Sequence, residues 1–230
     1  MAEKIFAIGD IHGCHHKLAT LLGRLPFDKT NDTLVFLGDY INRGPDSRKV
    51  LDTLVALGET CTHVVFLKGN HEQALLEYTL TGDVEDFRLL RMMGGEATAA
   101  SYGASLRHLI DLSCMPPAHQ QFLRNLRFSF TADNYLFTHA DCAELPPLRP
   151  GASAEEDPGV RRHFEAQLLA SRRLAREALC LAEPGPVVVF GHLPFSTPLV
   201  KPDRIGIDTG AVFGNLLTAV ELPTLRFYHA

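Results

Sequence analysis

The chain has 230 residues, of which 46% are hydrophobic and 21% charged, and these fractions exclude a disordered, collagenous or coiled-coil protein. Its 22 basic and 27 acidic residues give a formal net charge of −5, without the basic excess of a general nucleic-acid binder. The apolar runs fall far short of the roughly 20 residues that span a bilayer, and the first predicted strand leaves no room for a signal peptide. We therefore expect a cytoplasmic protein, and the five separated cysteines predict free thiols.

Three strand–loop–helix units follow one another in the first third of the chain. Each unit begins with a short apolar strand, continues through a polar loop and ends in a helix whose apolar residues recur at helical spacing. We expect strands at residues 4–8, 33–37 and 64–67, followed by helices at residues 15–24, 47–57 and 72–80. This alternation predicts an α/β sheet whose functional loops gather at the carboxyl ends of the strands.

The rest of the chain departs from this alternation. Residues 82–126 are helical by pattern and predict an insert or cap, and a hairpin turn at residues 132–134 joins two further strands. The remaining expected elements are strands at 126–131 and 134–138, a loop at 144–159, an Arg-rich helix at about 161–181, and strands at 187–190, 204–208, 215–220 and 225–228. Because no linker interrupts this series, we expect one domain over residues 1–230.

Potential metal ligands stand directly after the predicted strands. In chain order they are Asp10 and His12, then Asp39, then Asn70 beside His71, then His139, and finally His192. Oxygen and imidazole donors from five strand ends can meet only at one edge of the sheet. The set is too large for one tetrahedral ion, and its mixed donors suit two divalent ions such as manganese, iron or zinc that share a carboxylate.

Five ordered motifs resemble those of the calcineurin-like metallophosphoesterases. They are Gly9-Asp10-Ile11-His12-Gly13, Gly38-Asp39-Tyr40-Ile41-Asn42-Arg43-Gly44, Gly69-Asn70-His71-Glu72, His139-Ala140 and Gly191-His192. They are most similar to the phosphoprotein phosphatase branch, in the small bacterial and phage type that also includes symmetrical diadenosine tetraphosphatases. The resemblance runs from residue 5 to about residue 220 and implies a four-layer α/β/β/α sandwich with a helical insert at about 82–126.

The resemblance also implies which residues bind the two metal ions. Asp10 and His12 would bind the first ion, and Asp39 would bridge both. Asn70, His139 and His192 would bind the second ion. The Asp208-Thr209-Gly210 segment, which resembles the family's Ile-Asp-Thr-Gly, would support the metal-bound loop.

Three further residues would act on the phosphate and the leaving group. The resemblance makes His71 the general acid and Arg43 a phosphate ligand. Arg172 is our candidate for a second phosphate arginine, because residues 167–172 weakly resemble the family's Asp-Leu-Leu-Trp-x-Arg segment. Its competitors are Arg161, Arg162, Arg173 and Arg176.

Two positions depart from the family pattern. Asn42 stands where the family has an aspartate that stabilises the charged catalytic histidine; it keeps an acceptor but loses the charge. We therefore expect weaker general-acid catalysis, above all for alkoxide leaving groups. Asp141 replaces the usual glycine after His139-Ala140, where it could repel phosphate, add a metal ligand or face the solvent.

The expected function is the hydrolysis of phosphate monoesters by a metal-activated water, with two divalent ions, manganese foremost. The main interpretation is a serine/threonine protein phosphatase-like enzyme that acts on phosphorylated protein. The alternatives are a symmetrical dinucleoside tetraphosphate hydrolase, which acts on a nucleotide, and a catalytically weakened protein that binds metal and phosphate. We expect no membrane partner and no general nucleic-acid binding, and the sequence leaves the oligomeric state open.

Overall fold

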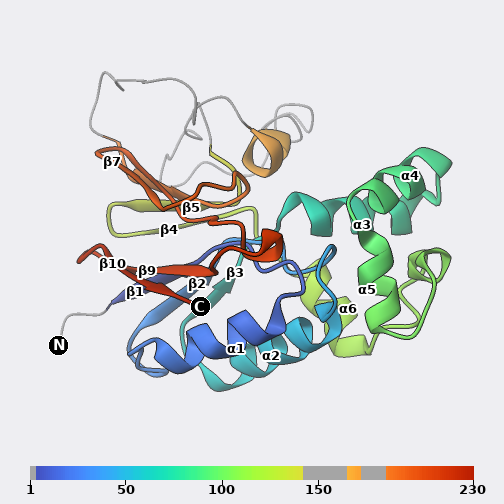
Figure 1. Cartoon of the computed structure of the whole chain (residues 1–230), viewed down its shortest axis with the longest axis horizontal. Helices are drawn as coiled ribbons and strands as arrows, with labels where there is room; N and C mark the ends of the chain where they lie inside the picture. The colour runs from blue at the N-terminus through green and yellow to red at the C-terminus, as the bar shows by residue number, and fades with distance from the viewer. Residues whose placement is uncertain (1–3, 142–164, 172–184) are drawn as a thin grey trace, which may run out of the picture.

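The computed structural model describes residues 4–141, 165–171 and 185–230, and two five-stranded sheets lie face to face at its centre (Figure 1). The first sheet has the order β10-β9-β1-β2-β3. Its strands are β1 (Ile5–Ile8), β2 (Thr33–Phe36), β3 (Val64–Phe66), β9 (Thr218–Leu222) and β10 (Arg226–His229). The second sheet has the order β4-β5-β6-β8-β7. Its strands are β4 (Ser129–Ala132), β5 (Tyr135–Thr138), β6 (Val187–Phe190), β7 (Leu199–Lys201) and β8 (Arg204–Gly206).

The three strand–loop–helix units build the parallel part of the first sheet. β1 pairs in parallel with β2, and β2 with β3, because α1 (His15–Arg24) and α2 (Ser47–Thr60) carry the chain back between them. The third helix, α3 (Asn70–Thr81), begins two residues earlier than predicted. Its start is capped by the Glu72 carboxylate, which accepts the Gly69 N–H at 3.0 Å. Asn70 and His71 therefore lie in the first turn of a helix and not in a loop.

The second sheet confirms the predicted hairpin and adds a strand. β4 and β5 pair antiparallel around Asp133, while β5, β6 and β8 run parallel. The strand at β7 was not predicted, since Leu199, Val200 and Lys201 form only a short edge strand that is largely accessible to solvent. The expected strand at 126–131 begins only at Ser129, because Arg127 is bridged instead to Leu67.

Alternating side chains divide the strands between two layers of core. On β1, Ile5 and Ala7 pack toward the second sheet, whereas Phe6 and Ile8 pack under α1 and α2. A short helix at 165–170 covers the outer face of the second sheet, where Leu168 packs with Val188. Two sheets between helical layers confirm the predicted α/β/β/α sandwich.

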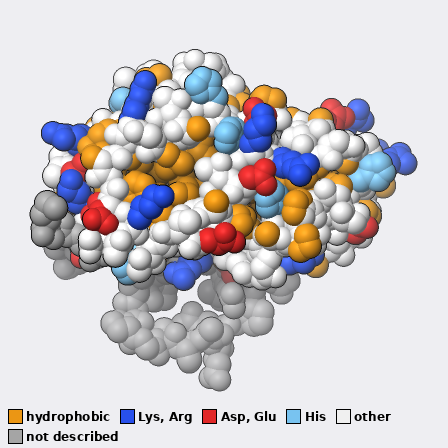
Figure 2. Space-filling model, turned by 90° about the horizontal axis from the view of Figure 1, so that it is seen from below, with side chains coloured by type: hydrophobic (Ala, Val, Ile, Leu, Met, Phe, Trp, Pro, Cys, Tyr) orange, Lys and Arg blue, Asp and Glu red, His pale blue; other side chains and the backbone are white. Residues whose placement is uncertain are grey.

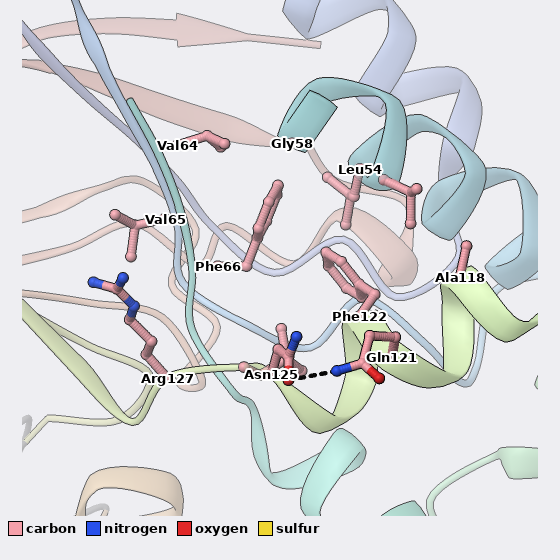
Figure 3. Close-up of a pocket in the computed structure, with 12 residues that line it drawn as sticks. Leu54, Gly58, Val64, Val65, Phe66, Ala118, Gln121, Phe122, Asn125 and Arg127 are labelled. Carbon is pink, nitrogen blue, oxygen red and sulfur yellow. Dashed lines mark hydrogen bonds between the residues drawn. The ribbon is translucent and has the colours of Figure 1, made fainter. Parts of the chain in front are cut away.

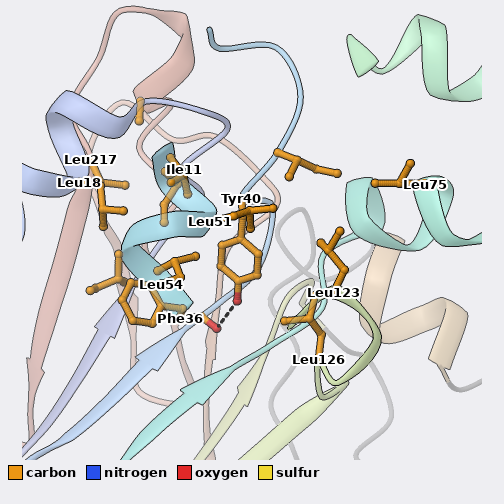
Figure 4. Close-up of a cluster of buried hydrophobic side chains, with 14 of the residues drawn as sticks. Ile11, Leu18, Phe36, Tyr40, Leu51, Leu54, Leu75, Leu123, Leu126 and Leu217 are labelled. Atoms are coloured by element: carbon orange, nitrogen blue, oxygen red, sulfur yellow. Dashed lines mark hydrogen bonds between the residues drawn. The ribbon is translucent and has the colours of Figure 1, made fainter. Parts of the chain in front are cut away.

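The helical segment predicted at residues 82–126 is also confirmed. Its elements are α4 (Val84–Met92), α5 (Gly95–Ser101), the 3₁₀ turn η1 (Leu106–Leu109) and α6 (Pro117–Arg124). Leu123 of α6 joins the same buried cluster as Leu54 of α2 and Tyr40, whose hydroxyl donates to Phe36 O (Figure 4). The segment is thus anchored to the helical side of the first sheet, and α4 projects away from the sheets (Figure 1).

Several predictions fall wholly or partly outside the described residues. The loop at 144–159 lies there, as does the helix at 161–181 apart from its helical part at 165–170. Within the described ranges, Cys14, Cys61 and Cys114 are free thiols. The described helices include none that is long and apolar enough to cross a membrane.

The surface on the side of α1 and α2 carries apolar patches between charged side chains (Figure 2). One pocket of about 330 Å³ lies between α2, β3 and α6, where Phe66 and Phe122 contribute to its wall (Figure 3). None of the predicted site residues lines it. The site must therefore be sought elsewhere, at the ends of the strands.

Candidate functional site

The structure brings the six predicted metal ligands together where strands of both sheets end. We expected them at one edge of a single sheet, but three strands of the first sheet and two of the second supply them. Asp10 and His12 follow β1, Asp39 follows β2, Asn70 opens α3 after β3, His139 follows β5 and His192 follows β6. The facing sheets thus converge on one site from opposite sides.

Asp39 lies at the centre of this arrangement. Its Oδ2 is 3.3 Å from His12 Nε2, and its Oδ1 is 3.5 Å from His139 Nε2. It belongs to two groups of potential ligands whose donor atoms cluster closely, one with His12 and His71 and the other with His139 and His192. A carboxylate that offers one oxygen to each group has the geometry needed to bridge two cations.

Backbone carbonyls orient two of the imidazoles toward this centre. His12 Nδ1 donates to Ile41 O at 3.0 Å, and His139 Nδ1 donates to Leu37 O at 2.8 Å. Because a carbonyl oxygen can only accept, each Nδ1 carries the proton and each Nε2 presents a lone pair. His139 Nε2 then faces another acceptor, Asn70 Oδ1, at 3.0 Å. Two lone pairs held this close fit a cation between them, so the donor set suits a metal ion.

The protonation states of the site also favour the binding of metal ions. Burial raises the pKa of Asp39 to about 7, and burial together with Asp208 and Asp39 raises the pKa of Asp10 well above its usual range. Burial also lowers the pKa of His12 to about 3 and that of His139 to about 4. The imidazoles are therefore neutral, and the buried carboxylates lack compensating positive charge. Divalent cations would supply that charge.

The loops of the site carry backbone strain. Five residues outside glycine adopt positive φ angles here: His12, Asp39, Asn42, Arg43 and His192. Each such residue costs about 1–3 kcal/mol and persists only where the surroundings hold it. The strain is concentrated in the loop after β2, so that loop needs a strong anchor.

Glu72 provides this anchor, and sequence analysis did not assign it a role. Its Oε2 accepts the N–H of Asp39 at 2.9 Å, and its Oε1 accepts those of Tyr40 and Ile41 at 2.8 and 3.2 Å. Burial, reinforced by Asp39, raises the pKa of Glu72 to about 8. The available signal was its position three residues after Gly69, where a glutamate caps a helix.

The contact between Asn42 and His71 differs from the predicted one, in which Asn42 offered an acceptor. Asn42 Nδ2 lies 3.0 Å from His71 Nδ1, while Asn42 Oδ1 accepts the Thr98 hydroxyl at 2.8 Å. The amide therefore presents its donor to the imidazole and not its acceptor. His71 Nε2, 3.9 Å from Asp39 Oδ2, is buried without a hydrogen-bond partner among the described residues.

Thr98 is the second residue that sequence analysis missed. It lies on α5, is fully buried, and its hydroxyl also receives the backbone N–H of Asn42 at 2.8 Å. Burial, with the nearby His12 and Arg43, lowers the pKa of His71 far below its usual range. His71 is thus a neutral imidazole with its proton on Nε2, and that N–H points into the site.

Arg43 extends from the strained loop into solvent. Its Nη1 lies 2.8 Å from His12 Nε2, and its guanidinium lies 5.3 Å from the centre of the Phe213 ring. The fork of a guanidinium matches two oxygens of a phosphate. Arg43 can therefore present N–H groups to a phosphate beside the metal ligands.

The remaining predictions concern Asp141, Asp208 and Arg172. Asp141 is buried away from solvent, lies outside both groups of potential metal ligands, and accepts Arg204 Nη1 at 3.0 Å. None of the three expectations for its carboxylate describes this buried ion pair. Asp208 is buried near Asp10, and its Oδ1 accepts the Gly210 N–H at 2.8 Å. Arg172 lies outside the described residues.

Two named relatives align with this chain, one over most of its length and one over about a third. The asymmetrical bis(5'-nucleosyl)-tetraphosphatase PrpE of Oceanobacillus iheyensis is 28% identical and aligns with 97% of this chain and 90% of its own length. The symmetrical bis(5'-nucleosyl)-tetraphosphatase of Nitrosomonas europaea is 46% identical over 71 residues, which are 31% of this chain and 25% of that protein.

Solved structures share the fold. A putative diadenosine tetraphosphatase superposes with a TM-score of 0.65 at 24% identity, covering 100% of this chain and 94% of that one. A cold-active protein-tyrosine phosphatase of a psychrophilic Shewanella has a TM-score of 0.62 at 18% identity, covering 99% and 77%. The model of the calcineurin-like phosphoesterase family matches residues 3–204, a range that contains all six predicted metal ligands. The chain therefore belongs to the calcineurin-like phosphoesterase family and is a phosphoric ester hydrolase.

Proposed function

We propose that this enzyme hydrolyses dinucleoside polyphosphates at a phosphoanhydride bond, in preference to phosphorylated proteins. The observation that carries the proposal is the contact between Asn42 Nδ2 and His71 Nδ1. A donor at this position opposes a second proton on the imidazole, so His71 acts as a neutral hydrogen-bond donor and not as a strong acid.

The leaving group then decides which substrates are cleaved well. A serine or threonine alkoxide is strongly basic and requires a proton as it departs. The phosphate released from an anhydride is a much weaker base, and a hydrogen bond from His71 Nε2 is sufficient to stabilise it. The tetraphosphatase names of the full-length relatives support the same substrate class.

The six ligand residues would hold two divalent ions, with manganese the expected metal. Asp10 and His12 would hold the first ion, Asp39 would contribute to both sites, and Asn70, His139 and His192 would hold the second. When bound, the ions polarise the phosphate and supply a reactive water.

The chain's own groups position the substrate around the ions. Arg43 binds phosphate oxygens through its exposed guanidinium, and Glu72 holds the buried part of the same loop in its strained conformation. Arg172 remains the candidate for a second phosphate ligand. We also propose that residues 1–230 act as one catalytic domain.

A second candidate function is that of a serine/threonine phosphatase-like enzyme. It is favoured by the exposure of Arg43, because a phosphorylated side chain of a folded protein can reach an arginine on the surface. In that case proton donation to the alkoxide would have to come from a group other than the neutral His71.

The test compares three substrates with manganese-loaded enzyme: diadenosine tetraphosphate, a phosphothreonine peptide and p-nitrophenyl phosphate. We expect kcat/KM for the tetraphosphate to exceed that for the peptide at least about tenfold. His71→Ala should reduce turnover, whereas His63→Ala, an exposed histidine outside the site, serves as the matched control. The nucleotides formed show whether cleavage is symmetrical.

Two outcomes would contradict the proposal. A preference for the phosphothreonine peptide would favour the phosphatase instead. An absence of turnover on all three substrates, with two metal ions per chain confirmed by elemental analysis, would favour a metal- and phosphate-binding protein.

A further inference from the structure

A large aromatic side chain lies exposed beside the candidate metal centre. Phe213 ends the 3₁₀ turn η3 (Ala211–Phe213) and is 62% exposed. Its ring lies 5.3 Å from the Arg43 guanidinium, which in turn contacts His12. The ring is thus separated from a predicted metal ligand by a single side chain.

The turn that carries Phe213 is held firmly. Gly210 and Gly214 flank it with φ angles of 72° and 93°, a conformation that glycine adopts without strain. Lys17 Nζ donates to Ala211 O at 2.7 Å and also to Asn215 O. The exposure of the ring is therefore set by the fold, and the turn would lose little conformational freedom when a ligand binds to the ring.

The base of the turn is tied to the site itself. The Gly210 N–H donates to Asp208 Oδ1, and Thr209 Oγ1 donates to Leu216 O at 2.7 Å. The charge of Asp208 contributes to the raised pKa of Asp10. The segment from Asp208 to Phe213 therefore connects the surroundings of the predicted metal ligand Asp10 to an exposed aromatic ring.

We infer that Phe213 is a stacking platform for a nucleoside base of the substrate, adjoining the phosphates that Arg43 binds. This inference rests on the proposed function. In it, Phe213 is the residue by which the enzyme distinguishes a nucleotide from a phosphate compound that has no base. An aromatic ring stacks on any nucleobase, and Arg43 beside it matches the negative charge of the adjoining phosphate.

A fluorescence experiment tests binding without turnover. The chain contains no tryptophan, so Phe213→Trp introduces the sole indole. We expect its emission to be quenched by adenosine 5′-(α,β-methylene)diphosphate and not by methylenediphosphonate, which has the same phosphonate chemistry but no base. The matched control is Leu216→Trp, on the same segment and 50% exposed, which should show no difference between the two probes. Equal quenching of the Phe213→Trp protein by both probes, or quenching by neither, would overturn the inference.

A kinetic experiment separates stacking from an effect transmitted through Arg43. The measured quantity is kcat/KM for diadenosine tetraphosphate divided by kcat/KM for inorganic tripolyphosphate. We expect Phe213→Ala to lower this ratio about tenfold, mainly through KM, and Phe213→Tyr to restore it. An unchanged ratio would mean that Phe213 acts on Arg43 and not on the base.

The inference and the proposed function can fail separately. Normal cleavage of the tetraphosphate with an unchanged ratio in Phe213→Ala would reject only the platform. A wild-type preference for phosphopeptide would reject the proposed substrate, while the fluorescence experiment would still report directly on base stacking.

Discussion

Among the individual residues, Asn42 determines what His71 can do. Its amide is fixed by two contacts with Thr98, in which the hydroxyl donates to Oδ1 and accepts the backbone N–H. The remaining group, Nδ2, faces His71 Nδ1 at 3.0 Å. A carboxylate in its place would accept a hydrogen bond from Nδ1–H, and its negative charge would favour the imidazolium.

We therefore expect Asn42→Asp to increase kcat/KM on a phosphoserine peptide by about tenfold or more, within the range that general-acid catalysis contributes. Cleavage of diadenosine tetraphosphate should change much less, because its leaving group needs little proton donation. Steady-state kinetics on both substrates measures the effect, with Asn125→Asp, an exposed asparagine outside the site, as the control. Unchanged kcat/KM on the peptide would contradict this account of Asn42.

Among the secondary-structure elements, the start of α3 organises the loop after β2. Glu72 receives four backbone N–H groups through its two oxygens, from Asp39, Tyr40, Ile41 and Gly69. These bonds hold Asp39 at a φ of 53°, the conformation that points its carboxylate between His12 and His139. The helix thus positions a predicted metal ligand that it does not itself carry.

Glu72→Gln tests this role. Glutamine has one acceptor oxygen, so two buried N–H groups would face an NH₂ group, and each unsatisfied group costs about 1–3 kcal/mol. We expect a clear fall in Tm, together with weaker manganese binding by calorimetry. Glu77→Gln, further along α3, is the control because the described hydrogen bonds give the Glu77 carboxylate one donor, Gln73 Nε2, and no backbone N–H. Equal Tm and metal affinity in the two variants would argue against a role for Glu72 in holding the loop.

For the whole molecule, the buried carboxylates link stability to pH and metal. Asp39, with a pKa of about 7, and Glu72, with a pKa of about 8, keep protons in the folded metal-free protein that they lose on unfolding. The unfolded histidines, whose ordinary pKa is about 6.5, are largely neutral above about pH 7.5. Between about pH 7.5 and 8.5 the folded state therefore binds more protons than the unfolded state, and its stability must fall as the pH rises.

The expected result is a Tm that decreases from about pH 7.5 to 8.5 in chelator-treated protein, by about 2–4 °C for each kcal/mol lost. Metal-loaded protein should have a higher Tm that depends less on pH, because bound cations keep the carboxylates ionised. Scanning calorimetry with and without manganese measures both. A metal-free Tm that stays constant or rises over this range would show that the carboxylates do not control stability.

The sequence by itself determined the three strand–loop–helix units, the helical segment and the six potential metal ligands that converge on the site. These features are local: apolar periodicity marks each element, and a ligand that follows a buried strand must lie at the end of that strand. The order of the motifs was sufficient to place the chain in its family, which the match over residues 3–204 confirms.

Only the tertiary structure decided how the site residues are held. Thr98 is 56 residues from the Asn42 amide that it orients, and Arg204 is 63 residues from the Asp141 carboxylate that it pairs with. Phe213, near the C-terminus, contacts Arg43, which lies in the first quarter of the chain. Such contacts depend on side chains that the fold brings together from distant elements, and no periodicity or motif spacing records them. The direction of a hydrogen bond, and with it the protonation of His71, is therefore a property of the assembled structure.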